Sequence, residues 1–259
     1  MADEAAGEPG GTAVPLRADT ARRIAGVLRR QILRGAFGSG LLPDERALGV
    51  EFAASRNAVR DALRVLADEG LVERRRGVGT VVRSRPYRHP IDELAGLAEA
   101  LRRHGQVENR VRAAHRLPAP PAVAHRLQLL PDHEVVYLER LRLLDGQPVS
   151  LDCTYLAPEV GTPLLRLPWR ELEDNDVFHL IETVCGHPLG TADVTVQAVT
   201  ADAATARVLG MPAPGAVLLV ERLTRLGGGR PVDLEYLHVR GDRISLHGTL
   251  ARGGQPPRT

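Results

Sequence analysis

The sequence predicts an α+β protein of two domains, and three observations lead to this prediction. The chain has 259 residues, which suits two ordinary domains better than one. Residues 17–83 contain three stretches with helical hydrophobic spacing, followed by a short hairpin pattern. Residues 122–236 contain a duplicated pattern of helix, strand, tight turn and strand. We therefore expect a mostly helical N-terminal domain and a C-terminal domain built on an antiparallel sheet.

The domain boundaries follow from local composition. An acidic, Gly- and Ala-rich start predicts a disordered tail at 1–16, before a first domain at 17–83. The polar, Pro-containing stretch SRPYRHP predicts a linker at 84–90. The second domain is expected at 91–247, and a flexible C-terminal tail at 248–259.

Charge divides the chain in the same way. Overall, the chain has 34 basic and 32 acidic residues, which gives a net charge of +2. Residues 17–88 hold 16 Arg and 8 acids, whereas residues 89–259 hold 18 Arg and 21 acids. A basic front domain suits a polyanionic partner, and a mildly acidic back domain does not.

Several classes of protein are not indicated. No apolar stretch approaches the length of a membrane span, and the N-terminus lacks the pattern of a secretion signal. The two cysteines, Cys153 and Cys185, form neither a CxxC motif nor a disulfide framework. We expect a cytoplasmic protein with no membrane partner, no metal and no cofactor.

Three helices are expected in the first domain. The first covers 20–33, where apolar residues recur on one face. Pro43 opens the second, and acids in its first turn suit the positive end of the helix dipole. Ser55 is a favourable N-cap for the third, which runs from Arg56 to about Glu69.

A basic hairpin is expected after the third helix. Its strands are predicted at 71–73 and 80–83, and the tip at 74–79 carries three Arg and two Gly. Three helices followed by a basic hairpin are the parts of a winged helix-turn-helix, whose third helix enters the major groove of DNA.

Candidate DNA-binding residues lie on the third helix, the wing and the second helix. Arg can hold guanine through two hydrogen bonds and Asn can hold adenine, which favours base reading at the start of the third helix. Glycine in the wing lets the backbone come close to DNA. For any single Arg, a surface salt bridge is the alternative. The candidates are Arg46, Ser55, Arg56, Asn57, Arg60, Arg75, Arg76 and Gly77.

Three motifs of the first domain resemble the winged helix of the GntR family. They are LPDERAL at 42–48, SRNAVRDALRVLADEGLVERR at 55–75 and GVGTVV at 77–82. The resemblance implies a homodimer on a palindromic double-stranded DNA operator. It also implies DNA contacts by Arg46, Arg56, Asn57, Arg60, Arg76 and Gly77.

The second domain contains an internal repeat. Glu139 matches Glu221 and Arg140 matches Arg222, in each case 82 residues apart. Each copy ends in a hairpin with a Gly-containing turn. Two copies are too few for a solenoid, so we interpret them as the halves of one pseudo-symmetric sheet domain.

Strand alternation places charged residues on common faces. Arg140 and Arg142 share one face, Ser150, Asp152 and Thr154 share another, and Asp233 shares a third with Glu235. Two charged faces on paired strands could line a cleft. The alternative is a sheet face open to water, which is common in antiparallel sheets.

The repeats also resemble the UTRA domain of the HutC subfamily, over about 90–245. The matching stretches are VVYLERLRLLDGQPVSLDCTYLAP and AVLLVERLTRLGGGRPVDLEYLHVRGDR. The resemblance implies a fold similar to chorismate lyase, with an effector in a cleft. It assigns an anion grip to Arg140 and Arg142, carboxylates that accept ligand hydroxyls or amines to Asp152 and Asp233, and a helix N-cap to Asp176.

We expect a transcription regulator, most simply a repressor, whose operator affinity is set by a small-molecule effector. The alternatives are an enzyme of chorismate-lyase-like fold with an appended DNA-binding domain, and a nucleoid protein without effector. Asp176 adds negative charge where a phosphate would dock, which favours an effector other than a simple sugar phosphate. The Arg pair would take one carboxylate or polar acceptor. Alternatively, Asp176 is only a cap and Asp152 holds the Arg pair in a structural salt bridge.

Overall fold

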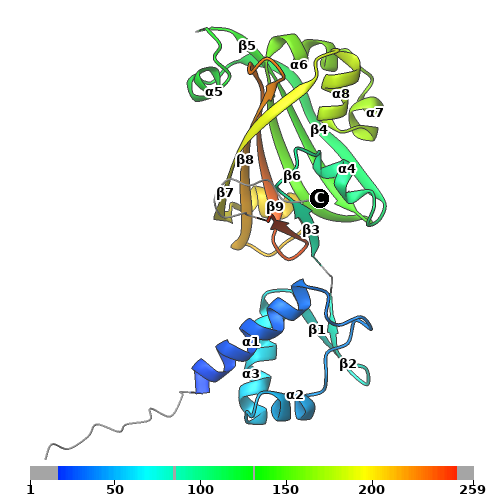
Figure 1. Ribbon diagram of the computed structural model, residues 1–259, viewed down its shortest axis with the longest axis vertical. Helices are drawn as coiled ribbons and strands as arrows, with labels where there is room; N and C mark the ends of the chain where they lie inside the picture. Colours follow the sequence, from blue (N-terminus) through cyan, green and yellow to red (C-terminus); the bar gives the residue numbers. More distant parts are fainter. Residues whose placement is uncertain (1–16, 84–85, 131, 250–259) are drawn as a thin grey trace, which may run out of the picture. The chain divides into compact units, whose positions relative to one another are not determined.

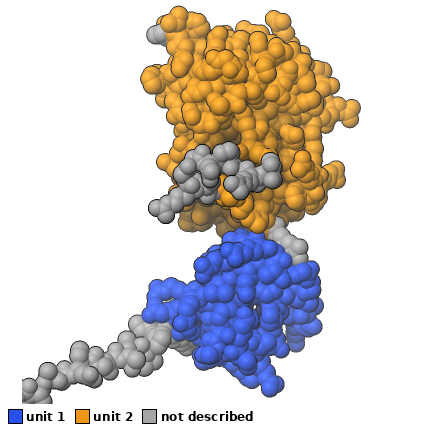
Figure 2. Space-filling model, in the orientation of Figure 1, with its two compact units in different colours: residues 1–85 blue, residues 86–259 orange. Residues whose placement is uncertain are grey.

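The chain divides into two compact units, residues 1–85 and 86–259 (Figure 2). The computed structural model describes residues 17–83, 86–130 and 132–249. Residues Tyr87–Pro90, which fall within the linker expected at 84–90, form a strand of the second unit in which Tyr87 and His89 are buried. The tail expected at 1–16 and residues 250–259 of the C-terminal tail lie outside the described residues.

The first unit has three helices followed by a two-stranded antiparallel hairpin, which confirms the expected order. Buried aliphatic side chains from all three helices form its core, among them Leu28, Leu48 and Leu66. The elements are α1 (Arg17–Leu33), α2 (Glu45–Glu51), α3 (Arg56–Asp68), β1 (Val72–Arg75) and β2 (Gly79–Val82).

Local side chains set the ends of these elements. The Asp44 carboxylate accepts a hydrogen bond from the Ala47 amide at 2.7 Å, so α2 begins after Asp44 and Pro43 precedes the helix. The wing is also tighter than expected, because Arg74 and Arg75 belong to β1. Its turn contains Gly77, whose φ of +76° favours glycine.

The second unit is built on a six-stranded, fully antiparallel sheet in the order β4-β5-β6-β9-β8-β7 (Figure 1). The first repeat supplies β5 and β6, the second supplies β8 and β9, and the halves meet where β6 pairs with β9. β4 precedes the first repeat and pairs with β5, and β7 precedes the second and pairs with β8. The strands are β4 (Val107–Pro118), β5 (Glu134–Leu144), β6 (Gln147–Leu156), β7 (Leu189–Ala201), β8 (Gly215–Leu226) and β9 (Pro231–Arg240).

Helices cover both faces of this sheet, and a small parallel pair of strands, β3 and β10, completes the unit. One face carries α4, α6, α7 and α8, and the other carries α5 and α9, one from each repeat (Figure 1). The bounds are β3 (Tyr87–Pro90), α4 (Leu97–Leu101), α5 (Pro121–Arg126), α6 (Pro158–Leu165), α7 (Trp169–Asp174), α8 (Val177–Val184), α9 (Ala203–Val208) and β10 (Ile244–His247).

Two apolar clusters lie on the face covered by α4, α6, α7 and α8. One joins α6, α7 and α8 to one end of the strands through residues such as Leu138, Leu156 and Leu180. The other joins α4, β3 and β10 to the opposite end through residues such as Leu97 and Leu237. The middle of this face therefore lies between two apolar walls. Within the described part of the chain, no helix is long and apolar enough to cross a membrane.

Gly161 sets how closely α6 approaches the sheet. A Cβ atom at this position would lie 2.7 Å from Val136 Cβ and 3.0 Å from Leu156 Cβ. We therefore expect Gly161→Ala to lower the free energy of unfolding of the second unit by about 1–3 kcal/mol, because the extra methyl group overpacks this contact. Chemical denaturation followed by the fluorescence of Trp169, the only tryptophan, measures the effect. Gly228→Ala is the control, since a Cβ there would meet nothing within 4 Å. Equal stability of the two variants would contradict the expectation.

Candidate effector site and DNA-binding surface

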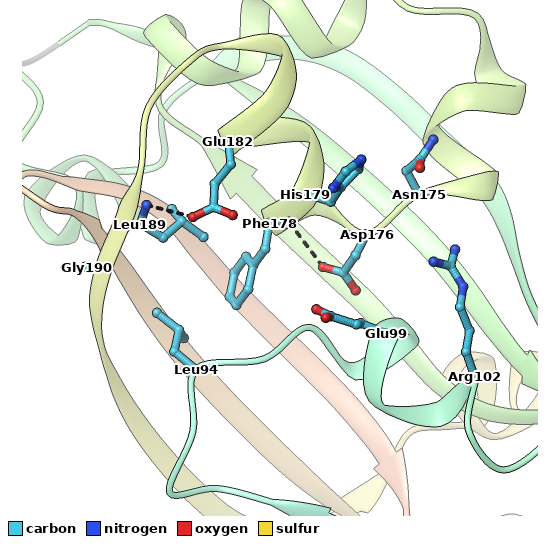
Figure 3. Close-up of a pocket in the computed structure, with 10 residues that line it drawn as sticks. All are labelled: Leu94, Glu99, Arg102, Asn175, Asp176, Phe178, His179, Glu182, Leu189 and Gly190. Atoms are coloured by element: carbon cyan, nitrogen blue, oxygen red, sulfur yellow. Dashed lines mark hydrogen bonds between the residues drawn. The ribbon is translucent and has the colours of Figure 1, made fainter.

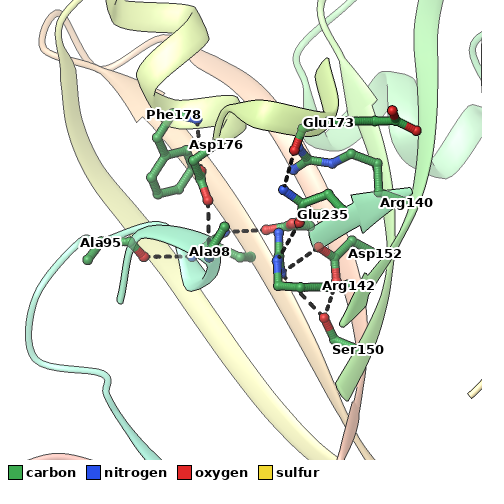
Figure 4. A network of polar contacts seen from close by, with 12 residues as sticks. Ala95, Ala98, Arg140, Arg142, Ser150, Asp152, Glu173, Asp176, Phe178 and Glu235 are labelled. Atoms are coloured by element: carbon green, nitrogen blue, oxygen red, sulfur yellow. Dashed lines mark hydrogen bonds and ion pairs between the residues drawn. The ribbon is translucent and has the colours of Figure 1, made fainter. Parts of the chain in front are cut away.

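A belt of charged side chains crosses the covered face of the sheet between the two apolar clusters (Figure 4). Arg140 on β5 lies opposite Asp152 on β6, and Arg222 on β8 lies opposite Glu235 on β9. The two pairs occupy equivalent positions in the two repeats. We call the set the charged belt; its members, each less than 10% exposed, are Arg140, Arg142, Asp152, Arg222, Asp233 and Glu235.

Arg142 and Asp152 form a buried ion pair. The Arg142 Nη1 atom lies 2.7 Å from Asp152 Oδ2, and Arg142 Nε donates to Asn109 Oδ1 at 2.9 Å. The Ser150 hydroxyl donates to Asp152 Oδ1 at 2.8 Å. The structural salt bridge that the sequence offered as an alternative, from Asp152 to the Arg pair, is therefore present for Arg142.

Arg140 is stabilised by hydrogen bonds to backbone carbonyl groups. Its Nη1 atom donates to the carbonyl oxygens of Leu172 at 3.1 Å and Asn175 at 3.0 Å, at the C-terminal end of α7. Carbonyl oxygens at this end of a helix carry partial negative charge. Arg140 therefore fastens α7 to the sheet, and its guanidinium group lies beneath the helix layer.

Arg222 joins the second repeat to the helices above it. Its guanidinium group pairs with Glu235 and donates to the carbonyl oxygen of Ala95 at 3.4 Å. The guanidinium carbon also lies 4.4 Å from the centroid of the Phe178 ring on α8, within range of a cation–π interaction. Arg222 thus connects β8 to the segment before α4 and to α8.

Asp176 is the N-cap of α8 and connects that helix to α4 (Figure 4). Its carboxylate accepts hydrogen bonds from the Phe178 amide at 3.1 Å and the Ala98 amide at 3.3 Å. Burial alone would raise the pKa of Asp176, but Arg142, Arg140, Arg222 and the Phe178 amide hold it below its ordinary value. Asp176 is therefore an ionised carboxylate enclosed by positive charge.

A cavity of about 490 Å³ lies beside Asp176, between α4, α8 and the start of β7 (Figure 3). Its charged lining consists of three carboxylates and one guanidinium group, so acids outnumber bases. The lining residues are Leu94, Glu99, Arg102, Asn175, Asp176, Phe178, His179, Glu182, Leu189 and Gly190.

One of the five residues expected to bind the effector lines this cavity, and the other four are buried beneath the helix layer. Arg140, Arg142, Asp152 and Asp233 are at most 1% exposed and do not line the cavity; Asp176 does. The reason is the helix layer, which covers the charged face instead of leaving it open to water or to a ligand. Glu99 and Glu182 were not predicted as lining residues. The internal repeat did indicate that Arg222 and Glu235 are the second-repeat equivalents of Arg140 and Asp152.

The DNA-binding candidates on α2 and α3 are exposed. Arg46 lies in the first turn of α2, and Arg56, Asn57 and Arg60 lie in the first two turns of α3. Ser55 caps α3 by accepting a hydrogen bond from the Ala58 amide at 3.3 Å, as its position predicted. The start of α3 therefore presents two guanidinium groups and one amide to solvent.

The wing adds further exposed charge. Arg75 ends β1, and the turn after it contains Arg76 and Gly77, all exposed. On the α3 side, Glu45 Oε2 lies 3.3 Å from Arg60 Nη2 and Glu45 Oε1 lies 3.3 Å from Arg74 Nη2. Glu45 thus connects α2, α3 and the wing, and it brings Arg74, which the sequence candidates omitted, next to Arg60.

Burial strongly affects Asp233 on β9. Its desolvation, together with the nearby Glu235 carboxylate, raises the pKa of Asp233 to about 8, against the opposing effect of Arg222. The pKa of Glu235 is also raised, mainly by burial. At neutral pH, Asp233 is therefore protonated in the folded protein.

This protonation predicts a pH-dependent stability. In the unfolded chain Asp233 ionises near pH 4. Its favourable contribution to the free energy of unfolding is therefore complete below pH 4 and is lost as the pH rises toward about 8. We expect Asp233→Asn, which cannot ionise, to lose less unfolding free energy than the wild type between pH 5 and 8. Chemical denaturation across this range, followed by Trp169 fluorescence, measures it. Asp193→Asn, an exposed carboxylate paired with Arg225, should keep the wild-type slope; if Asp233→Asn keeps it as well, the assignment of the proton to Asp233 is wrong.

Known proteins match both units. Residues 20–82 match the model of the bacterial regulatory proteins of the gntR family, and residues 102–245 match the model of the UTRA domain. The chain is 34% identical over 168 residues to the mannosyl-D-glycerate transport/metabolism system repressor MngR of Escherichia coli, covering 63% of this chain and 67% of that protein. It is 26% identical over 227 residues to the probable transcriptional regulator PhnF of Escherichia coli, covering 87% of this chain and 92% of that protein.

The solved structures give the same result. The crystal structure of PhnF from Mycobacterium smegmatis aligns with a TM-score of 0.59 and 26% identity, over 89% of this chain and all of that chain. The α+β fold with an N-terminal helix-turn-helix is therefore shared with known regulators. This chain belongs to the gntR family of bacterial regulatory proteins, and it is a DNA-binding transcription regulator whose ligand-binding part is a UTRA domain.

Proposed function

We propose that this regulator acts as a homodimeric, non-catalytic cytoplasmic repressor that binds a palindromic operator and responds to a small molecule held in the cavity beside Asp176. The observation that carries the proposal is the exposed row of Arg56, Asn57 and Arg60 at the start of α3, in the same chain as a UTRA domain with a cavity of about 490 Å³. A dimer would place two such helices on the two halves of a symmetric site.

The DNA-binding proposal assigns different tasks to the candidate residues. Arg56, Asn57 and Arg60 can read base edges in the major groove, since Arg and Asn suit guanine and adenine. Arg75 and Arg76 lie at the wing, where contacts to phosphate groups hold the protein in register. Arg46, Ser55 and Gly77 complete the proposed surface.

The effector proposal places the ligand between α4 and α8. The cavity is lined by Leu94 and Glu99 from the segment that follows the boundary at residue 85, and by Phe178 and Glu182 from α8. A ligand at this position would contact the first segment of the second unit, which follows the DNA-binding unit along the chain. This continuity supports coupling between the cavity and the operator.

Loss of one base-reading side chain should reduce operator affinity selectively. We expect Arg56→Ala to weaken binding to the operator by about 1–3 kcal/mol, or roughly 5- to 150-fold, and to relax preference at the contacted base pair. The operator is first selected from random DNA, and affinities are then measured on the selected site and on random duplex. Arg22→Ala is the control, because it removes an equal charge from an exposed position on α1. Equal losses for Arg56→Ala on the two DNAs would refute base reading by Arg56.

Effector binding and DNA binding should influence each other by the same factor. A thermal-shift screen of metabolites identifies ligands of the full-length protein, and isothermal titration then measures their affinity with and without operator DNA. We expect a change of about 5- to 150-fold, the usual range for allosteric coupling, and an equal change in operator affinity when ligand is added. A ligand that fills the cavity with identical affinity in both states would overturn the proposed switch.

A further inference from the structure

The Asp176 carboxylate lies at a position that has the features of an anion-binding site. Backbone amides from two helices point at it, Phe178 N from α8 and Ala98 N from α4. The positive end of the α8 dipole acts in the same direction. Amides at a helix N-terminus are the usual donors for a bound phosphate, sulfate or carboxylate group.

Buried arginines add to these donors. Arg140, Arg142 and Arg222 are each less than 10% exposed, and the charge of each favours the ionised form of Asp176. Within the described residues, Arg140 Nε and Arg222 Nε have no hydrogen-bond acceptor. The surroundings of Asp176 therefore favour a negative charge much more strongly than capping of a helix requires.

The carboxylate fills this position tightly. A Cβ atom at residue 96 would lie 2.2 Å from Asp176 Cγ, so only glycine lets the backbone before α4 approach the carboxylate so closely. The Asp176 side chain thus occupies the place that the amides and arginines would otherwise offer to an anion from solution.

The rest of the cavity lining is acidic. Glu99 and Glu182 are exposed and line the cavity together with Asp176 (Figure 3). Arg102, the guanidinium group of the lining, donates to the carbonyl oxygen of Asp174. A ligand with a negative group would therefore meet three carboxylates and an anion-binding position that is already filled.

We propose that Asp176 is a built-in anion that keeps phosphate and carboxylate groups out of this cavity, and that the cavity takes a small organic cation whose protonated amine is held by Glu99 and Glu182. The identity of this ligand as the effector rests on the proposed function. Asp176 is then a specificity-determining residue, since it converts an anion-binding position into one that rejects anions.

Asp176→Ser tests the first part, because a serine keeps a helix cap but leaves room and uncompensated positive charge for an anion. The probe is inorganic phosphate, added to the full-length protein at constant ionic strength in a thermal-shift assay. We expect a saturable rise in the Tm of Asp176→Ser of about 3–6 °C at ten times the dissociation constant. The wild type should not respond. Glu99→Gln is the matched control: it removes one lining carboxylate but leaves the anion position filled, so it should not respond either.

Three results of the phosphate titration would overturn the proposal: a saturable Tm rise in the wild type, an equal rise in Glu99→Gln, or no response in folded Asp176→Ser. If Asp176→Ser folds only with phosphate in the buffer, that dependence supports the proposal. If it does not fold at all, Asp176→Gly is the second variant; glycine is tolerated at an N-cap and leaves the position empty, so phosphate should stabilise this variant more than the wild type.

The cation is tested by dividing the ligands found in the thermal-shift screen into amines, neutral sugars, carboxylates and phosphate esters. Stabilisation of the wild type by amines, weakened in Glu99→Gln and Glu182→Gln, supports the proposal. Stabilisation by a carboxylate, a phosphate ester or a neutral sugar through this cavity overturns it. Neither assay contains DNA, so a protein that fails to couple ligand to operator, which would defeat the proposed function, still gives a clear result here.

Discussion

The burial of three guanidinium groups on one face of the sheet constrains the whole ligand-binding unit. A buried charge without a partner costs several kcal/mol, whereas paired and hydrogen-bonded charges can be accommodated. Arg142 has Asp152, Arg222 has Glu235, and Arg140 has the carbonyl oxygens at the end of α7. The carboxyl groups of Asp152 and Glu235 lie against Arg142 and Arg222, and Asp176, whose pKa the three arginines lower, adds an ionised carboxylate. The helices above the sheet are therefore constrained to positions at which they bring Asp176 and these carbonyl groups to the arginines.

The pseudo-symmetry of the domain explains why the charges lie in the middle of the sheet, and the connection between the repeats explains why the two halves differ. Both repeats place an arginine on the first hairpin strand opposite an acid on the second, as Arg140 with Asp152 and Arg222 with Glu235. The halves meet at β6 and β9, so the two pairs become neighbours. The chain between β6 and β7 then folds into α6, α7 and α8, which cover both pairs and bring Asp176 to them.

Structural features that depend on neighbouring residues could be predicted from the sequence, whereas features that depend on residues far apart in the chain could not. The cap at Ser55, the wing and the repeat could be predicted, because capping, turn chemistry and strand alternation act over a few residues. The outer strands β4 and β7 were not predicted: both lie at the edges of the sheet, and most residues of β7 are exposed, although Val194 and Val196 alternate with polar residues. Alternation assigned Arg140 and Arg142 to one face but carries no information about the layer above it. Likewise, the second amide on Asp176 comes from Ala98, 78 residues away.

The attachment of α4 suggests how the proposed switch could work at small energetic cost. The segment after residue 85 is held by the pairing of β3 with β10 and by the apolar cluster that contains Leu97. Two long hydrogen bonds join it to the charged belt, from Ala98 N to Asp176 Oδ2 at 3.3 Å and from Arg222 Nη1 to the Ala95 carbonyl oxygen at 3.4 Å. His89 on β3 is buried next to them, and burial together with Arg222 and Arg142 lowers its pKa to about 4, so it adds no charge at neutral pH. A typical hydrogen bond contributes about 0.5–1.5 kcal/mol, so exchanging these two is comparable to the 1–3 kcal/mol of a usual allosteric coupling. Within the proposed function, a ligand that draws Glu99 or Asp176 toward itself would therefore act first on these two contacts between the segment and the charged belt.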